Sequence, residues 1–298
     1  MRRRDRGRRN GDRAVTADFQ RRLRRIGEQR SLRNHPLHRE LVEGALSPAA
    51  LRSWVTSEFA LASSELRADA PETLEAWLDL AQAVGEDRAA TLLGERTLPA
   101  VGEACGLLLE SMQAATPLDA ISGSLTDLFL AERLAESAAS FEKHHGWVDP
   151  KARTALADLG QRADRRASAA LDFVEAHATT DGLRGGCVAA LEQRFEIHRS
   201  VFDAVSKANA HLRLSGAAQR RADPVDGRPM VVLPERAVRL NPSGDEILTL
   251  CDGSRSALDV ASELQNRHPE VARLEEDVHA FLSEMEGLGV LERRVSSS

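Results

Sequence analysis

Apolar residues recur three and four positions apart through most of the chain, which is the spacing of amphipathic helices. The clearest run follows Ser47 and Pro48, a capping residue and a first-turn proline that mark a helix start. A second run covers 74–84 and ends at Gly85, a residue type that often closes a helix. Further helices are expected over 98–114, 117–141, 150–178 and 183–209. The pattern therefore predicts a bundle of about seven helices.

The pattern changes after about residue 210. Two short β-branched runs, Met230–Pro234 and Ala237–Asn241, stand two residues apart, which predicts a β-hairpin. Pro242 stops the second strand because proline cannot donate to a strand ladder. Three short helices over 243–250, 256–265 and 274–287 and a last strand at 290–291 are expected to follow. A hairpin followed by three helices is typical of a winged-helix-like module.

These changes predict three segments and a mainly α fold class. Residues 1–17 are expected to form a basic, disordered tail, and 18–209 a helical bundle. Residues 210–298 are expected to form the small winged-helix-like α+β domain, which is long enough to fold alone.

Composition narrows the class of protein. Hydrophobic residues make up 42% and charged residues 29%, which excludes wholesale disorder. No apolar run reaches the roughly 18 residues of a membrane span, and no signal peptide is seen. Three isolated cysteines form neither a disulfide framework nor a metal motif. We expect a soluble, cytoplasmic protein without membrane contact.

Charge is unevenly distributed. Residues 1–30 hold twelve arginines against four acids, a net charge of +8, whereas the other 268 residues sum to −14. An arginine-rich start could bind nucleic acid or an acidic partner, but a solvated tail is the favoured interpretation. The acidic remainder argues against a nucleic-acid-binding body.

Residues 212–294 resemble the pyrroloquinoline quinone (PQQ) synthesis protein D family. The matching stretches are Val232-Leu233-Pro234-Glu235, Val238-Arg239-Leu240-Asn241, Glu246-Ile247-Leu248, Cys251-Asp252-Gly253, Asp277-Val278-x-x-Phe281-Leu282 and Gly289-Val290-Leu291-Glu292. The resemblance implies a peptide chaperone, a recognition element that holds the leader of a ribosomal precursor peptide for a radical SAM maturation enzyme.

Residues 18–209 resemble PQQ synthesis protein C, a cofactor-free oxidase with a haem-oxygenase-like helical bundle. Matching segments include Asn34-His35-Pro36-Leu37-His38, Glu75-Ala76-Trp77-Leu78, Leu98-Pro99-x-Val101, Ser124-Leu125-Thr126-Asp127-Leu128-Phe129 and Phe202-Asp203-Ala204. The order of the two parts is similar to that of the bifunctional C/D fusion. The resemblance also implies a possible homodimer and no cofactor.

Departures from the C family fall on residues expected to act on substrate. Leu32 stands where the family has histidine, Glu58 where it has arginine and Leu108 where it has tyrosine. The connection before Leu74 is also short by about one helix. The family substrate carries several carboxylates, whose burial demands arginine or lysine partners. We therefore expect a chamber that has lost its positive lining, and weak or no PQQ synthase activity.

Three residues remain as catalytic candidates by resemblance. Arg165 and Arg194 are expected to hold the substrate, and His35 is a weaker candidate that more simply buttresses the turn before Pro36. An active oxidase that uses these residues on the same or a different substrate is the alternative function.

Other chemistry is weakly supported. His35-x-x-His38 and His144-His145 could suggest a metal, but no paired Glu-x-x-His accompanies them, so no metal is expected. Ser124 lacks a nucleophile elbow and fits a capping role.

The winged-helix-like module raises a DNA-binding regulator as a further alternative. The helix over 274–287 carries mostly acidic side chains, which is the wrong charge for duplex DNA. A peptide fits better, added as a strand beside Ala237, Val238, Arg239, Leu240 and Asn241. Its apolar side chains would rest on an exposed helix face formed by Leu274, Val278 and Phe281. Proline at Val238 is expected to abolish binding.

Overall fold

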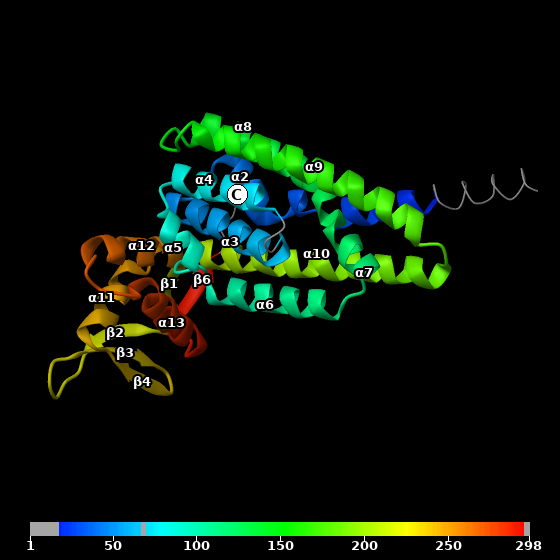
Figure 1. The fold of residues 1–298 in the computed structure, drawn as a ribbon. Helices are drawn as coiled ribbons and strands as arrows, with labels where there is room; N and C mark the ends of the chain where they lie inside the picture. Colours follow the sequence, from blue (N-terminus) through cyan, green and yellow to red (C-terminus); the bar gives the residue numbers. More distant parts are fainter. Residues whose placement is uncertain (1–17, 67–69, 295–298) are drawn as a thin grey trace, which may run out of the picture.

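The computed structural model describes residues 18–66 and 70–294, so the arginine-rich segment 1–17 lies outside the described residues. Residues 18–209 form a helical bundle, and residues 211–294 form a smaller module at one end of it (Figure 1). Within the described residues, no helix is both long enough and apolar enough to cross a membrane.

The bundle is built from helices that lie along one another (Figure 1). In chain order they are a helix over residues 18–30, η1 (Leu32–Asn34), α2 (Pro36–Glu43), α3 (Pro48–Leu66), α4 (Pro71–Ala83), α5 (Arg88–Leu93), α6 (Pro99–Ala114), α7 (Pro117–Gly123), η3 (Ser124–Phe129), α8 (Leu130–His144), α9 (Lys151–His177) and α10 (Asp181–Asn209). Several begin with proline, which fits the first turn because its missing N–H would have no partner there.

The single helix expected over 117–141 is divided into three elements: α7, η3 and α8. At the division, the hydroxyl of Ser122 donates to the carbonyl of Leu118 and that of Ser124 donates to the carbonyl of Ile121. Such bonds compete with the helical ladder and favour a tighter turn. Ser124 therefore has a local structural role, as the sequence suggested.

Two short helices, α2 and α5, were not expected. His35 and Asp87 cap their first turns, and Gly44 and Gly94 close them in the left-handed conformation. The start and stop signals were present in the sequence, but the helices are too short to show a periodic apolar face.

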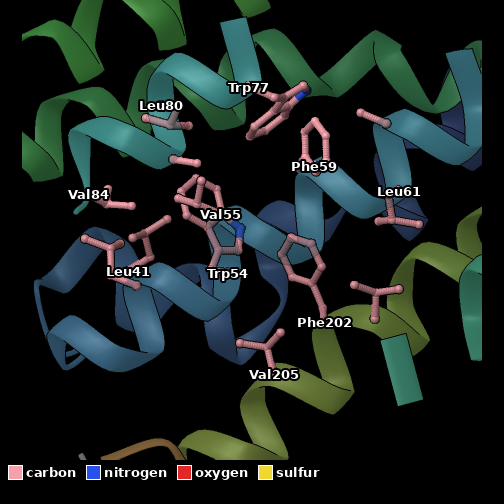
Figure 2. Packing of buried hydrophobic residues seen from close by; sticks show 14 of the residues in the cluster. Leu41, Trp54, Val55, Phe59, Leu61, Trp77, Leu80, Val84, Phe202 and Val205 are labelled. Atoms are coloured by element: carbon pink, nitrogen blue, oxygen red, sulfur yellow. The ribbon is translucent and has the colours of Figure 1, made fainter. Parts of the chain in front are cut away.

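The largest core cluster lies where α2, α3, α4 and α10 meet, and Figure 2 shows it. Trp54 is 1% exposed and lies among Leu41, Val55 and Phe202, while Phe59 faces Trp77 farther along α3. These aromatic side chains pack as core, which is the interpretation favoured from their spacing.

The module combines two small antiparallel sheets with three helices. Its elements are β1 (His211–Leu214), β2 (Gln219–Ala222), β3 (Pro229–Leu233), β4 (Arg236–Arg239), α11 (Pro242–Leu250), β5 (Asp252–Ser256), α12 (Ala257–Arg267), α13 (Leu274–Gly287) and β6 (Leu291–Arg294). One sheet has the order β5-β1-β6 and the other β2-β3-β4. The expected hairpin is β3–β4, with Val231 opposite Val238.

Three details of the module differ from expectation. Helix α11 begins at Pro242, because the Asn241 side chain accepts from the Gly244 N–H and caps the helix two residues earlier than Ser243 would. Strands β2 and β5 were missed. Both are short and polar, so their pairing with β3 and β1 had no apolar alternation to reveal it.

The module packs directly on the bundle. Leu258 of α12 belongs to the large bundle core cluster. Beside it, Glu86 is buried and forms ion pairs with Arg52 at 3.3 Å and with Arg96 at 3.2 Å. Arg96 also lies 3.9 Å from Glu275 of α13. Apolar contact and a buried acid thus hold the two parts together.

Candidate functional sites: a bundle cavity and a sheet edge

A cavity in the bundle is lined by residues of η1, α3, α4, η3, α8, α9 and α10. It is lined by Ser31, Leu32, Glu58, Leu61, Ala62, Glu65, Trp77, Thr126, Asp127, Phe129, Leu130, Arg133, Arg166, Phe195 and His198. Its volume is about 40 Å³, enough for a few water molecules. Pockets that hold a drug-sized ligand measure roughly 300–1,000 Å³, so this chamber is closed to such a molecule in this conformation.

Glu58 projects into the cavity wall from α3 and is 5% exposed. It forms a buried ion pair with Arg133 of α8 and also accepts a hydrogen bond of 3.2 Å from the Trp54 indole N–H. The Arg133 guanidinium lies 4.9 Å from the centre of the Phe202 ring. One oxygen of this carboxylate, Oε1, is therefore held by two protein donors, at the position where the resemblance led us to expect arginine.

Glu65 joins α3 to α10 through two partners. Its Oε1 accepts from Arg194 at 3.0 Å and lies 2.7 Å from Nε2 of His198. Burial alone would raise the pKa of this carboxyl, but His198 and Arg194 outweigh burial and lower the pKa to about 2. Glu65 is thus an anion under ordinary conditions, and it neutralises Arg194.

Asp127 of η3 and Arg166 of α9 form the third pair, with 2.8 Å between Oδ2 and Nε. Burial raises the pKa of Asp127, and Arg166 opposes that effect. The chamber wall therefore carries arginines contributed by α8 and α9, Arg133 and Arg166, contrary to the expected loss of its positive lining. Each of these arginines is paired with an internal carboxylate, so the positive charge is cancelled rather than absent.

The structure places the three catalytic candidates in different settings. Arg165 is exposed on α9 and does not line the cavity, whereas Arg166 does, because one residue turns a helix by about 100°. Arg194 is buried and bound to Glu65. His35 caps α2 by accepting from Leu37, and its Nε2 lies 2.9 Å from Asp203, so it has a structural role at the turn.

Two of the expected apolar replacements are buried. Leu32 lines the cavity, and Leu108 is fully buried within α6. In the described ranges, no group of three or more His, Cys, Asp or Glu side chains lies together as a metal site would require.

The second candidate site is the outer edge of β4. Leu240 donates its N–H to Pro229 of β3 at 2.9 Å, and Val238 lies opposite Val231. Successive residues of an antiparallel strand point their backbone groups to alternate sides. The N–H and C=O of Ala237 and Arg239 therefore point away from β3. In the described part of the chain β4 is an edge strand of its sheet, so these groups face no further strand.

The side chains predicted to hold a peptide do not all lie together. Ala237, Arg239 and Asn241 are exposed and Val238 is half-buried, but Leu240 is buried in the module core. On α13, Leu274 and Phe281 are half-buried, whereas Val278 is 0% exposed and belongs to the core cluster. Val278 therefore cannot contact a guest, which corrects its assignment to an exposed face.

Sequence reasoning missed Glu65, Asp127, Arg133, Arg166 and His198 as neighbours. Their separations along the chain are large, for example 75 residues between Glu58 and Arg133. The available signal was an acid or base on an otherwise apolar helix face, and Glu58 gave that signal.

Comparison with known proteins agrees with this architecture. Residues 230–291 match the family described as coenzyme PQQ synthesis protein D (PqqD). The pyrroloquinoline-quinone synthase of Pseudomonas aeruginosa (strain LESB58) is 26% identical, over 64% of this chain and 88% of that protein. The bifunctional coenzyme PQQ synthesis protein C/D of Methylorubrum extorquens is 23% identical, over 91% of this chain and 93% of that protein.

Fold comparison supports the assignment of the bundle. A domain of unknown function from Shewanella denitrificans OS217, described as having a heme oxygenase-like fold, superposes with a TM-score of 0.51 at 14% identity. The match covers 63% of this chain and 90% of that domain. The chain is thus similar to the bifunctional coenzyme PQQ synthesis protein C/D over 91% of its length, with a bundle of haem-oxygenase-like fold followed by a module that matches the PQQ synthesis protein D family over residues 230–291.

Proposed function

We propose that this chain acts in PQQ-type biosynthesis in the cytoplasm by binding a ribosomal precursor peptide. The guest adds as a strand to β4 of the module and is presented there to a radical SAM maturation enzyme. In this proposal the bundle is a docking scaffold that has lost PQQ synthase activity.

The observation that carries the peptide proposal is the outer edge of β4. Main-chain N–H and C=O groups on an unpaired edge are a template for another extended chain. Ala237 is exposed and small, so it leaves those groups accessible. The half-buried Val238 supplies an adjacent apolar contact. The match of residues 230–291 to the D family supports the same conclusion.

The proposal of a silent bundle rests on the cavity. A polycarboxylate entering it would have to displace Glu58, Glu65 and Asp127 from the arginines that they neutralise. Separating buried ion pairs is strongly unfavourable, because each displaced charge then lacks a partner. The small volume adds a steric barrier.

Calorimetry with the co-encoded precursor peptide tests peptide binding. We expect micromolar affinity, about −8 kcal/mol. Ala237→Pro should remove most of this affinity, because it deletes the outward N–H that would donate to the guest. The N–H of Val238, which is bonded to β3, is left in place. Val238→Pro, the change first suggested by the sequence, is a poor test because the Val238 N–H points toward β3 and its loss would damage the hairpin.

A matched control is available on the opposite edge of the same sheet. Asp223 donates its N–H to Arg228 at 2.7 Å, so alternation points the Ala222 backbone groups away from β3. Ala222→Pro makes the same chemical change there and should leave affinity unchanged. Absence of heat with the wild type at high micromolar peptide, or equal affinity in Ala237→Pro, would end the proposal.

One observation favours an oxidase as a second candidate function. His198 lines the cavity and is oriented by Glu65, as a general base would be. Oxygen uptake with candidate small-molecule substrates tests it. An active oxidase requires turnover that is lost in His198→Ala, whereas the silent-bundle proposal predicts no turnover in the wild type.

A further inference from the structure

Helix α13 has two different flanks beside its buried face. Glu275, Glu276 and His279 line a cavity between the module and the bundle, so that flank faces the bundle. Helical spacing places Asp277, Phe281 and Glu284 together on the opposite flank. The bundle therefore covers the first flank of α13 and leaves this second flank uncovered.

The second flank lies beside the end of β4. A Cβ built on Gly244 would come within 3.0 Å of the Phe281 ring, so Phe281 packs against the first turn of α11. That turn follows β4 directly, after Leu240 and Asn241. Val238 and Phe281 also pack on the same core cluster. A strand added to β4 would thus run along the flank that carries Phe281.

The acids of α13 differ between the two flanks. The acids of α13 that lie outside the second flank each form an ion pair. Glu275 pairs with Arg96, Glu276 with Arg273 and Glu286 with Arg293. Among the residues that the structure describes, Asp277 and Glu284 form no ion pair, and both are exposed. The open flank therefore carries two carboxylates that have no ion-pair partner among the described residues.

We infer that the guest of this groove is a basic, amphipathic extended segment, with lysine or arginine two positions from an apolar residue. The inference rests on the proposed strand addition at β4. Residues two apart in a strand point to the same side. The apolar side chain would contact Val238 and Phe281, and the basic one would pair with Asp277 or Glu284. A glutamate or aspartate at that position would be repelled.

Selection from a displayed library of random peptides tests this without knowledge of the natural guest. The full chain, the double variant Asp277→Lys/Glu284→Lys and Ala237→Pro are each used as bait. Peptides enriched by the wild type should carry lysine or arginine two positions from an apolar residue. The double variant should bind a synthetic copy of the leading peptide at least about tenfold more weakly and should enrich acidic peptides instead. Glu110→Lys, an exposed acid on α6, is the matched control and should select as the wild type does.

The outcomes separate the two claims. Enrichment that is the same with Ala237→Pro, or no enrichment at all, would overturn strand addition at β4. Enrichment that requires Ala237 but shows no basic preference, or is unaltered by the double reversal, would leave strand addition standing and refute the charge preference.

Discussion

The bundle cavity and the β4 edge treat their polar groups in opposite ways. In the cavity, Arg133 and Arg166 are each matched by a carboxylate of the same chain, and the space left is about 40 Å³. At the β4 edge, the backbone groups of Ala237 and Arg239 point outward. The flank of α13 that does not face the bundle carries Asp277 and Glu284, which are exposed and form no ion pair among the described residues. A site binds through groups that the protein leaves unsatisfied. This difference supports the proposal that the module binds the guest, whereas the cavity charges stabilise the bundle.

The largest effect is expected from breaking a cavity pair. Glu58→Ala leaves Arg133 buried without its carboxylate, which should lower the free energy of unfolding by about 3–5 kcal/mol. Denaturant unfolding measures it. Glu132→Ala removes an exposed partner of Arg33 and should cost less than about 1 kcal/mol. Equal, small losses for both variants would mean that the cavity charges are not structurally coupled.

Proline substitutions sharpen the description of the edge. Val238→Pro removes a hydrogen bond to β3 and should destabilise the module by about 3 kcal/mol. Ala237→Pro loses only an outward N–H and should cost less than about 1 kcal/mol. Thermal unfolding of the two full-length variants compares them. If Ala237→Pro were the more destabilising change, the N–H of Ala237, and not that of Val238, would be the one bonded to β3.

Acid should lower the free energy of unfolding by protonating Glu65. Its pKa is depressed from 4.5 to about 2 in the folded chain, so its stabilisation is complete above pH 4.5 and is lost as the pH falls toward 2. The effect is up to about 3 kcal/mol. The difference in unfolding free energy between wild type and Glu65→Gln should shrink over this range. A difference that is constant with pH would contradict the assignment.

The smallest effect should be at Arg165. This side chain is exposed, so Arg165→Ala should change stability by less than about 0.5 kcal/mol. Arg166→Ala leaves the buried Asp127 unpaired and should cost about 1–3 kcal/mol. Parallel chemical denaturation of the two variants tests whether adjacent arginines on α9 have these different roles.

The sequence by itself determined the elements whose signals are local. Pro48, Ser256 and the apolar spacing of 274–287 predicted α3, α12 and α13, because caps and periodicity act within a few residues. The hairpin β3–β4 was also predictable, since its strands are two residues apart. The resemblance to the C family, in contrast, was what singled out Glu58, which stands where that family has arginine.

Only the tertiary structure decided which charges meet and which edge stays open. Glu58 and Arg133, or Glu65 and His198, are brought together by packing of helices distant in sequence, and no local rule specifies such a pair. The strands β2 and β5 exist because partners elsewhere supply their hydrogen bonds. Whether Val238 or Ala237 faces a guest likewise depends on the register of β4 against β3, which is fixed by pairing across the sheet.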